Sequence, residues 1–580
     1  MCGIVAASSV IDVQDDVVAA LARVQYRGYD SFGFAWVTEA GGLAATRSTE
    51  ADAVHETRLP LSRTVLGHTR WATHGEVNLA NCHPHMSSNA EFALVHNGIV
   101  TNFDQLRPDD YAQPSDSGLI VKLLETALRH TQSRLAALRQ VTSQLEGRNT
   151  VVTLFNDGEI LAYRQGSPLV VGKGRDQGVY LASDQLAFSA ACREVCRISD
   201  GEFLSIQSGQ VEILSAELVP RQQDWLPVTE QYQAADKEGF KHFMLKEVME
   251  QWQSIPAVLQ AADSRAFVEA VRLLQKARRI VVVGAGGAYF TGRQIAWLLR
   301  NEAGLDAIDV PAYEYESFAN LITAGDVLIA VSQSGETADT LQAIELAKSA
   351  SVKVISILNV PGSSMAELSD VSLQQNSGAE VCVLSTKSAT AQVAIGYCLG
   401  LATMNRQAEA RQHIQTLSHC LAAEMTPEVL AVAKALADRI AQHQSVYVLG
   451  RNDHHAVAQI AALNIKEASY VHAEAFSAGE LKHGVLALIT EGVPVLVLVG
   501  KGDKGMAQVI AEVKARGAWV IGLLADEECR SVCDDHMMLP AAGSILAALI
   551  PGQLLAYYTA IAKNLNPDRP RNLAKSITVL

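Results

Sequence analysis

Residues 326–337 read DVLIAVSQSGET, and this stretch decides the fold of the C-terminal part of the 580-residue chain. The apolar run from Val327 to Val331 is typical of a strand buried on both faces of a parallel sheet. Hydroxyls, an amide and a glycine follow, where the strand turns into a helix. Such a turn binds phosphate through its main-chain N–H groups and the helix dipole. The stretch therefore predicts a phosphate cradle, with simple N-capping by serine and threonine as the alternative.

The same organisation occurs twice in the chain. Apolar runs that end at Gly284 and Gly450 lie 166 residues apart, and the runs that begin at Asp326 and Gly492 have the same offset. Two pairs of landmarks with one offset indicate a duplicated unit. Continuous apolar strands that alternate with helices predict doubly wound parallel sheets. At the place of the cradle the second copy has GKGDKG (residues 500–505) and lacks the serines, so we expect one phosphate site per chain.

The N-terminus carries a different signal, a cysteine directly behind the initiator. Cys2 has a side chain small enough for Met1 to be removed, which leaves a free α-amine on the cysteine. This amine has a pKa near ~8, so it can act as general base for the thiol of the same residue. A buried cysteine on a first strand is the alternative when Cys2 is considered alone.

Later residues supply the other parts of a site that cleaves a carboxamide. Asn97 and Gly98 offer two neutral donors for a tetrahedral oxyanion. Arg70 is a bidentate partner for the α-carboxylate of an amino acid, and Asp116 is the candidate for its α-ammonium. We expect these side chains to gather around Cys2.

The composition limits the partners of the chain. A net charge of −15, a pI near 5.5 and the lack of a lysine or arginine run argue against nucleic acid and anionic membranes. No basic region precedes an apolar stretch at the N-terminus, and the apolar runs are too short to span a bilayer, so we expect a cytoplasmic protein. Residues 545–562, interrupted by Pro551 and Gly552, predict a buried helix pair. Nine cysteines are typical here of reduced thiols, and we expect no metal and no cofactor.

Longer motifs connect the chain to a known family. The N-terminal part resembles the N-terminal-nucleophile glutamine amidotransferases in MCGIV (1–5), YRGYDS (26–31), RWATHG (70–75), NCHPH (81–85), HNG (96–98) and SDQL (183–186). The stretch SQSGETADT (332–340) resembles the sugar isomerase (SIS) domains. Over essentially the whole chain, the arrangement resembles the glutamine–fructose-6-phosphate aminotransferases, with NVPGSS (359–364), STK (385–387), EASY (467–470), HAEA (472–475), GELKHG (479–484) and PRNLAKS (570–576).

The resemblance implies an α/β protein in which an N-terminal-nucleophile (αββα) glutaminase domain precedes two doubly wound parallel-sheet SIS domains. The expected boundaries are 2–215 for the glutaminase domain, 216–245 for a polar linker, 246–410 and 425–565 for the SIS domains, and 566–580 for a C-terminal active-site tail. In this family, ammonia released from L-glutamine passes through an internal channel to a sugar phosphate. The family precedent is a homodimer.

For the glutaminase half, the resemblance implies that Cys2, Asn97 and Gly98 are catalytic and that Trp71 gates the ammonia channel. It further implies that glutamine is bound by Arg70, Thr73, His74, His83 and Asp116.

For the sugar half, the resemblance implies that Lys575 forms a Schiff base with the open-chain ketose. His483 would assist ring opening, from the neighbouring chain of a dimer, and Glu467 would move a proton between C1 and C2. These roles suit an amine nucleophile and a carboxylate base. The sugar phosphate, D-fructose 6-phosphate converted to D-glucosamine 6-phosphate in the simplest case, would be bound by Ser332, Gln333, Ser334, Thr337, Val383, Ser385 and Ala574.

Some residues depart from the family pattern at the sugar site. The family's first sugar loop normally reads CGTSY, whereas residues 285–289 read AGGAY, so Gly287 and Ala288 replace a threonine and a serine. Asn464 replaces a lysine three positions before Glu467. A lost charge-assisted contact of this kind is worth ~1.5–3 kcal/mol.

Three alternatives therefore remain for the sugar half. The first is an ordinary aminotransferase that acts on fructose 6-phosphate. The second is a paralogue that aminates a different sugar phosphate, and the third is a sugar-phosphate sensor whose SIS pair binds without turnover. The retained Glu467, His483 and Lys575 argue against the sensor, because a binding module needs no Schiff-base lysine.

Overall fold

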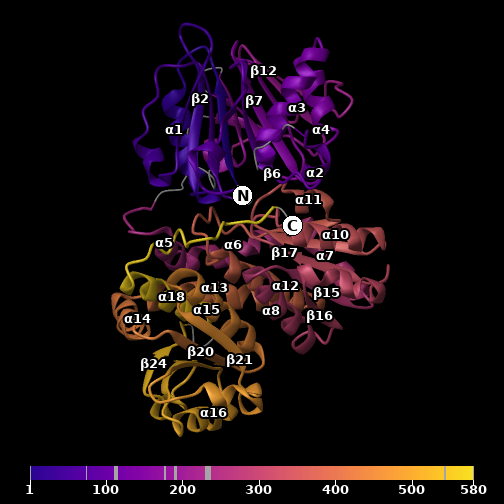
Figure 1. The fold of residues 1–580 in the computed structure, drawn as a ribbon. Helices are drawn as coiled ribbons and strands as arrows, with labels where there is room; N and C mark the ends of the chain where they lie inside the picture. The colour runs from indigo at the N-terminus through magenta and orange to yellow at the C-terminus, as the bar shows by residue number, and fades with distance from the viewer. Residues whose placement is uncertain are drawn as a thin grey trace. The chain divides into compact units, whose positions relative to one another are not determined.

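The computed structural model of the chain describes residues 2–72, 75–109, 111, 115–174, 178–188, 192–228, 237–540 and 544–578. The chain folds into two compact units, which Figure 1 colours by residue number. The first unit comprises Met1–Ala235 and, from the far end of the chain, Ala574–Leu580; the second comprises Asp236–Leu573. Within the described residues, no helix is long and apolar enough to cross a membrane.

Two antiparallel sheets form the centre of the first unit. The eight-stranded sheet contains, in spatial order, β14 (Leu226–Pro227), β11 (Cys192–Arg197), β9 (Val170–Gly174), β10 (Val179–Ala182), β1 (Gly3–Ser8), β4 (Thr64–Arg70), β2 (Ser31–Val37) and β3 (Leu43–Ser48). The six-stranded sheet contains β13 (Gln210–Leu214), β12 (Phe203–Gln207), β8 (Ile160–Tyr163), β7 (Asn149–Phe155), β6 (Phe92–Gly98) and β5 (His85–Met86).

Alternate residues of these strands face two different apolar layers, as the pleat requires. On β4, Leu66 lies in the core that both sheets share, whereas Gly67 faces Leu21 of α1 (Gln14–Arg23). On β6, Val95 lies in the shared core, whereas Leu94 packs with α3 (Asp116–His130) and α4 (Arg134–Thr142). The layers are helix, sheet, sheet and helix (Figure 1), which is the αββα arrangement that the resemblance implies.

Two parallel five-stranded sheets form the second unit, and both have the same strand order. The first contains β16 (Ala307–Pro311), β15 (Ile280–Gly284), β17 (Val327–Val331), β18 (Lys353–Leu358) and β19 (Val371–Gln374). The second contains β21 (His472–Ser477), β20 (Ser445–Gly450), β22 (Pro494–Val499), β23 (Trp519–Leu524) and β24 (Asp535–Met538). The repeated order confirms the predicted pair of doubly wound sheets.

Helices cover both faces of each sheet, which explains why the strands are apolar throughout. Ile329 of β17 and Leu496 of β22 belong to one large cluster, so a single core joins one face of each copy. The other faces have separate cores. Within the described residues, the α-helices of this unit are α5 (Phe243–Met249), α6 (Gln251–Ala262), α7 (Arg265–Lys276), α8 (Gly287–Asn301), α9 (Tyr315–Phe318), α10 (Ala338–Ser349), α11 (Ser364–Leu368), α12 (Lys387–Thr403), α13 (Gln407–Glu424), α14 (Pro427–Ile440), α15 (Asp453–Ser469), α16 (Lys504–Lys514) and α18 (Leu549–Ala562).

The two copies meet through equivalent helices. Arg293 Nη1 of α8 donates to Gln459 Oε1 of α15 at 3.1 Å, and these positions are 166 residues apart. Equivalent residues therefore touch each other, as they do beside a local two-fold axis. The sequence offset and the packing describe the same duplication.

One predicted element is wrong. Residues 545–562 do not form a helix pair, because Leu549–Ala562 is one helix, α18, with Pro551 and Gly552 in its first turn. Proline is tolerated there because the first turn of a helix has no main-chain acceptor for the N–H that proline lacks.

The crossing of α8 and α12 yields a matched stability test. A Cβ on Gly396 would lie 2.5 Å from Ile295 Cγ1, whereas a Cβ on Gly400, one turn along α12, would lie 3.8 Å from Leu299 Cδ2. We expect Gly396→Ala to destabilise the chain by about 1–3 kcal/mol through overpacking. Gly400→Ala should stabilise it by about 0.5–1 kcal/mol, because alanine loses less main-chain entropy in a helix. Thermal unfolding midpoints that move in the same direction for both variants would contradict this packing.

Candidate functional site

Cys2 lies at the start of β1 and is held by the side chain of Asn97 from the facing sheet. Asn97 Oδ1 accepts a hydrogen bond from Cys2 N at 2.8 Å, and Asn97 Nδ2 donates to Cys2 O at 2.8 Å. Both residues are buried. Because a carboxamide nitrogen carries two hydrogens, one Asn97 N–H remains for an oxyanion. The structure thus brings the predicted nucleophile and the predicted oxyanion donor together.

The thiol of Cys2 faces the main chain of Trp71, directly after β4. Trp71 N donates to Cys2 Sγ at 3.5 Å, and Cys2 Sγ lies 3.8 Å from Trp71 O. Burial raises the pKa of the Cys2 thiol, since a thiolate loses its hydration there. The thiol is therefore protonated near neutral pH and needs a base before it can attack.

Arg27 is a site residue to which the sequence motifs assigned no role. Its Nε donates to Cys2 O at 3.2 Å, and its Nη1 contacts Asp184 Oδ2 at 3.3 Å. Tyr26 donates its hydroxyl to the same carboxylate oxygen at 2.6 Å. Burial, together with the neighbouring Asp184 charge, raises the pKa of Tyr26 well above its usual range, so this hydroxyl stays a donor. The motifs YRGYDS and SDQL contained the signal, but only their packing shows that they hold Cys2.

The predicted glutamine-binding side chains lie at the ends of elements of the same unit. Arg70 ends β4, where its guanidinium donates to Glu76 O at 3.2 Å and to Gly75 O at 3.4 Å. Asp116 begins α3 and accepts from Val100 N at 3.3 Å. Thr73 and His74 lie outside the described residues. Gly98 follows Asn97, and a Cβ there would collide with the carbonyl oxygen of Arg148.

His83 belongs to a buried group of histidine rings. Its ring centroid lies 4.1 Å from that of His68 and 4.7 Å from that of His85. Burial lowers the pKa of His68 and His83 well below the usual range and lowers that of His85 to about 4. These rings are neutral at pH 7, so His83 contributes no positive charge to a glutamine carboxylate.

The predicted phosphate cradle is a tight turn between β17 and α10. Ser332 Oγ accepts from Gly335 N at 3.0 Å and lies 3.1 Å from Thr337 Oγ1, and Ser334 Oγ accepts from Glu336 N at 3.2 Å. Gln333 is half-buried in the same turn. β17 and β15 are neighbours at the point where the strand order reverses, which is where such sheets bind ligands.

In the second copy, the chain's own carboxylate stands at the equivalent turn. Asp503 Oδ1 accepts from Gly505 N at 3.1 Å and from Arg451 Nη1 at 2.9 Å, at the first turn of α16. A negative charge is already present where a phosphate would meet the helix dipole. This provides a physical reason for the expectation of one phosphate site per chain.

The other predicted sugar-site residues come from several elements. Ser385 precedes α12, and a Cβ on Gly287 would lie 3.7 Å from its Cβ. Val383 N donates to Asp568 O at 3.4 Å. Glu467 is half-buried on α15, and His483 is exposed at the end of a short 3-10 helix. Ala574 and Lys575 belong to the C-terminal segment of the first unit, where Thr578 Oγ1 lies 3.4 Å from Ser167 Oγ.

Comparison with known proteins shows the families to which the parts of the chain are similar. Residues 29–184 match the class-II glutamine amidotransferases, and residues 273–402 and 439–563 match the SIS domain. The chain is 36% identical over 616 residues to a glutamine–fructose-6-phosphate aminotransferase (isomerizing) of Symbiobacterium thermophilum. It is 34% identical over 614 residues to that of Photorhabdus laumondii, and each alignment covers 100% of both chains.

The chain belongs to the glutamine–fructose-6-phosphate aminotransferase family. It resembles the solved C-terminal domain of the Francisella tularensis glucosamine–fructose-6-phosphate aminotransferase, with a TM-score of 0.53 and 27% identity over 58% of this chain and 100% of that one. It is thus a glutamine amidotransferase with two SIS domains, and the enzyme class expected from its motifs is confirmed.

Asn464 is the residue of this aminotransferase at which the sequence resemblance implies a lysine. It is 2% exposed on α15, and its Nδ2 has no hydrogen-bond partner within the described part of the chain. A neutral amide with an unused donor therefore stands where the resemblance implies a lysine. Gly287 has room for a Cβ in ordinary contact with Ser385 and Leu463, so the loss of a side chain there is not forced by crowding.

Among the described residues, no cluster of His, Cys, Asp or Glu could hold a metal ion.

The contacts of Asn97 define the first catalytic prediction for this aminotransferase. We expect Asn97→Ala to lower kcat for glutamine hydrolysis by about 10²–10³-fold, the usual effect of removing one oxyanion donor. KM should change little, because Arg70 and Asp116, and not Asn97, are the residues predicted to bind the two ends of glutamine. Steady-state release of glutamate measures both constants.

Asn102→Ala is the matched control for this prediction. Asn102 is also buried, and its carboxamide bonds Gln144 O at 2.9 Å and Glu146 N at 3.0 Å, without touching Cys2. This variant should lose stability but keep its kcat. A raised KM with an unchanged kcat in Asn97→Ala would assign Asn97 to binding instead.

Proposed function

We propose that this chain hydrolyses L-glutamine at Cys2 and transfers the ammonia to D-fructose 6-phosphate, forming D-glucosamine 6-phosphate. The observation that carries the proposal is the pair of hydrogen bonds from Asn97 to the main chain of Cys2. This contact places a neutral donor beside a buried thiol at the chain's N-terminus. The hydroxyl-rich turn at Ser332 supports a phosphorylated second substrate, and the names of the full-length relatives support fructose 6-phosphate.

The first half-reaction starts when removal of Met1 turns Cys2 N into an amine. The amine donates one hydrogen to Asn97 Oδ1, and its lone pair takes the proton of the thiol, whose raised pKa makes this transfer necessary. The thiolate attacks the side-chain carbonyl of glutamine, and Asn97 Nδ2 and Gly98 N–H stabilise the oxyanion. Ammonia leaves with the proton from the amine, and water then hydrolyses the thioester to glutamate. Trp71 gates the path of the ammonia.

The second half-reaction uses the sugar phosphate held by the cradle of residues 332–337. His483 opens the ring, and Lys575 condenses with the C2 carbonyl and releases water. Ammonia displaces the lysine to form a C2 imine. Glu467 then removes a proton from C1 and returns one to C2, which leaves an aldehyde at C1 and an amine at C2. We propose a homodimer in which His483 of each copy serves the site of the other.

Blocking the N-terminus tests the first half-reaction. A chain that carries a non-removable N-terminal extension should lose glutamine hydrolysis by at least about 10²-fold, because an amide nitrogen has no basic lone pair. Proteolytic removal of a cleavable extension, which exposes Cys2, should restore the activity. The processed Cys2→Ala chain should stay inactive. Full glutamate release from the blocked chain would contradict the role of the α-amine.

Product analysis tests the second half-reaction. With glutamine labelled with ¹⁵N in its amide and fructose 6-phosphate, mass spectrometry should detect ¹⁵N-glucosamine 6-phosphate, formed at about 1–10³ s⁻¹. Lys575→Ala should yield none. Amination of another sugar phosphate from a panel, with fructose 6-phosphate left unchanged, would refute the proposed substrate, and binding without any amination would refute the reaction.

A further inference from the structure

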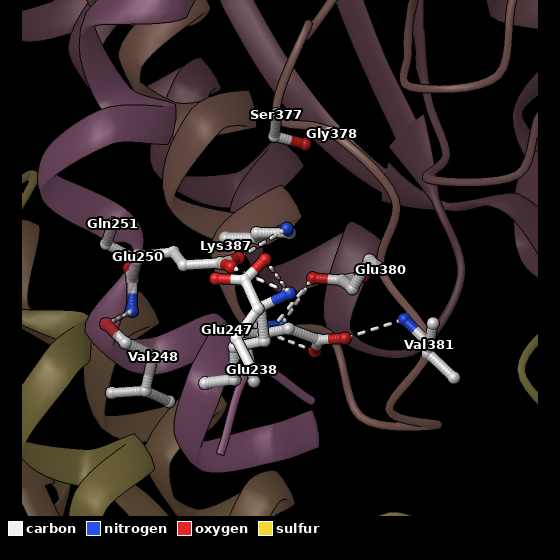
Figure 2. Close-up of polar contacts among 12 residues, drawn as sticks. Glu238, Glu247, Val248, Glu250, Gln251, Ser377, Gly378, Glu380, Val381 and Lys387 are labelled. Atoms are coloured by element: carbon white, nitrogen blue, oxygen red, sulfur yellow. Dashed lines mark hydrogen bonds and ion pairs between the residues drawn. The ribbon is translucent and has the colours of Figure 1, made fainter. Parts of the chain in front are cut away.

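A network of buried carboxylates lies beneath the first turn of α12 (Figure 2). Glu380 is 3% exposed, and its Oε1 accepts from Thr386 N and Ser388 N, each at 3.0 Å. Glu247 of α5 accepts from Val381 N at 2.6 Å. The hydroxyl of Thr386 bridges the two carboxylates, with Oγ1 3.0 Å from Glu247 Oε2 and 3.1 Å from Glu380 Oε1. These bonds fix the loop that carries Ser385 immediately before the helix.

The bonds of Glu380 determine which partner supplies each proton. Two main-chain N–H groups on one oxygen and the positive end of the α12 dipole both stabilise an ionised carboxylate. An ionised carboxylate can only accept. Glu380 Oε2 lies 2.7 Å from Ser388 Oγ, so the proton in that bond belongs to Ser388.

This assignment sets the direction of the next bond. Ser385 Oγ and Ser388 Oγ lie 2.6 Å apart, and either hydroxyl could donate if the pair stood alone. Ser388 has one hydroxyl hydrogen, and Glu380 has taken it. Ser385 must therefore donate to Ser388, and it presents only its lone pairs to anything else that it meets.

The place of Ser385 makes this direction matter for a ligand. Ser385 is half-buried, and its Cβ lies 3.7 Å from the position of a Cβ on Gly287, the first residue of α8. The turn from β15 into α8 and the cradle at Ser332 follow the two neighbouring strands of the switch point. Phosphate and carbonyl oxygens at neutral pH accept hydrogen bonds and offer no hydrogen to an acceptor. A sugar hydroxyl does offer one.

We infer that Glu380 and Ser388 are positioning residues that make Ser385 a pure hydrogen-bond acceptor, which selects a hydroxyl of the sugar and turns away the phosphate. The inference rests on the proposed function, because it requires a sugar phosphate at this crevice. Gly287 and Ala288 carry no hydroxyl, so the polarity of Ser385 has a correspondingly larger part in choosing the sugar.

One nearly isosteric change reverses this polarity. In Glu380→Gln, the carbonyl oxygen of the new amide must keep the place of Oε1, because two main-chain N–H groups donate to it there. The amide nitrogen then faces Ser388 Oγ and donates to it. Ser388 passes its own hydrogen to Ser385, and the hydrogen of Ser385 turns toward the ligand.

The experiment compares binding of fructose 6-phosphate with binding of analogues in which fluorine replaces one hydroxyl at a time. Fluorine cannot donate a hydrogen bond. Isothermal titration with the full wild-type chain should show one sugar position at which replacement of the hydroxyl by fluorine raises Kd by about tenfold, which is the usual value of one hydrogen bond. This rise in Kd is the fluorine penalty at that position. In Glu380→Gln this penalty should shrink at least about fivefold at that position and stay the same at the others.

Two further variants distinguish a reversed hydrogen-bond direction at Ser385 from damage to the fold. Glu250→Gln alters a carboxylate of the same network that bonds Lys387 at 2.8 Å, and it should leave every fluorine penalty unchanged. Ser388→Ala removes the acceptor of the Ser385 proton without removing a charge, and it should shrink the same penalty as Glu380→Gln. Glutamine hydrolysis and the unfolding midpoint report whether each variant is folded.

Each outcome bears on the inference. The inference is overturned if the wild type shows no fluorine penalty, or if the penalties in Glu380→Gln and Ser388→Ala equal those of the wild type. Binding of fructose 6-phosphate would in both cases leave the proposed function intact. An equal loss of affinity for all analogues and for inorganic phosphate assigns Glu380 a structural role only. If fructose 6-phosphate does not bind to the wild-type chain, the proposed function and this inference both fall.

Discussion

Main-chain groups that become buried at strand ends need hydrogen-bond partners, and in this chain side-chain amides and carboxylates supply them. The carboxamide of Asn97 accepts from the main-chain N–H of Cys2 and donates to its carbonyl oxygen. Glu380 accepts hydrogen bonds from main-chain N–H groups at the start of α12. Glu336 accepts from the N–H and the hydroxyl of Ser364 at the start of α11. The loops held in this way are the loops that carry the predicted chemistry. Folding and positioning of reactive groups therefore depend on the same bonds.

The need to pair main-chain groups at strand ends is also met differently in the two copies of the SIS fold. Both sheets have the same strand order, and both end a central strand at a turn into a helix. In the first copy the turn is built from Ser332, Ser334 and Thr337, whose hydroxyls order the loop without adding a charge. In the second copy Asp503 orders it with a carboxylate. An internal anion and a phosphate would compete for the same helix dipole, so Asp503 stabilises the turn of the second copy in a way that disfavours the phosphate predicted for the first.

The sugar half keeps the fold of the family while some of its residues differ from those that the resemblance implies. Asn464 offers a neutral donor at a buried position, and Gly287 offers no hydroxyl beside Ser385. For the sugar phosphate that we propose here, charge would contribute less to recognition and the direction of each hydrogen bond would contribute more. The carboxylate of Glu380 sets that direction at Ser385 without itself having to touch the ligand.

The sequence by itself determined the fold class and the duplication, because apolar runs with one offset specify strands through neighbours along the chain. In the same way it predicts a nucleophile with its own base at position 2 and a phosphate cradle at residues 332–337. Only the tertiary structure decided which distant groups meet. Arg27 donates to the carbonyl oxygen of Cys2, and Glu380 accepts from the hydroxyl of Ser388. The ring of His83 packs against that of His68. It also decided that Leu549–Ala562 is one helix. Local periodicity carries no information about such partners, since they come together only when separate elements pack and buried polar groups must pair.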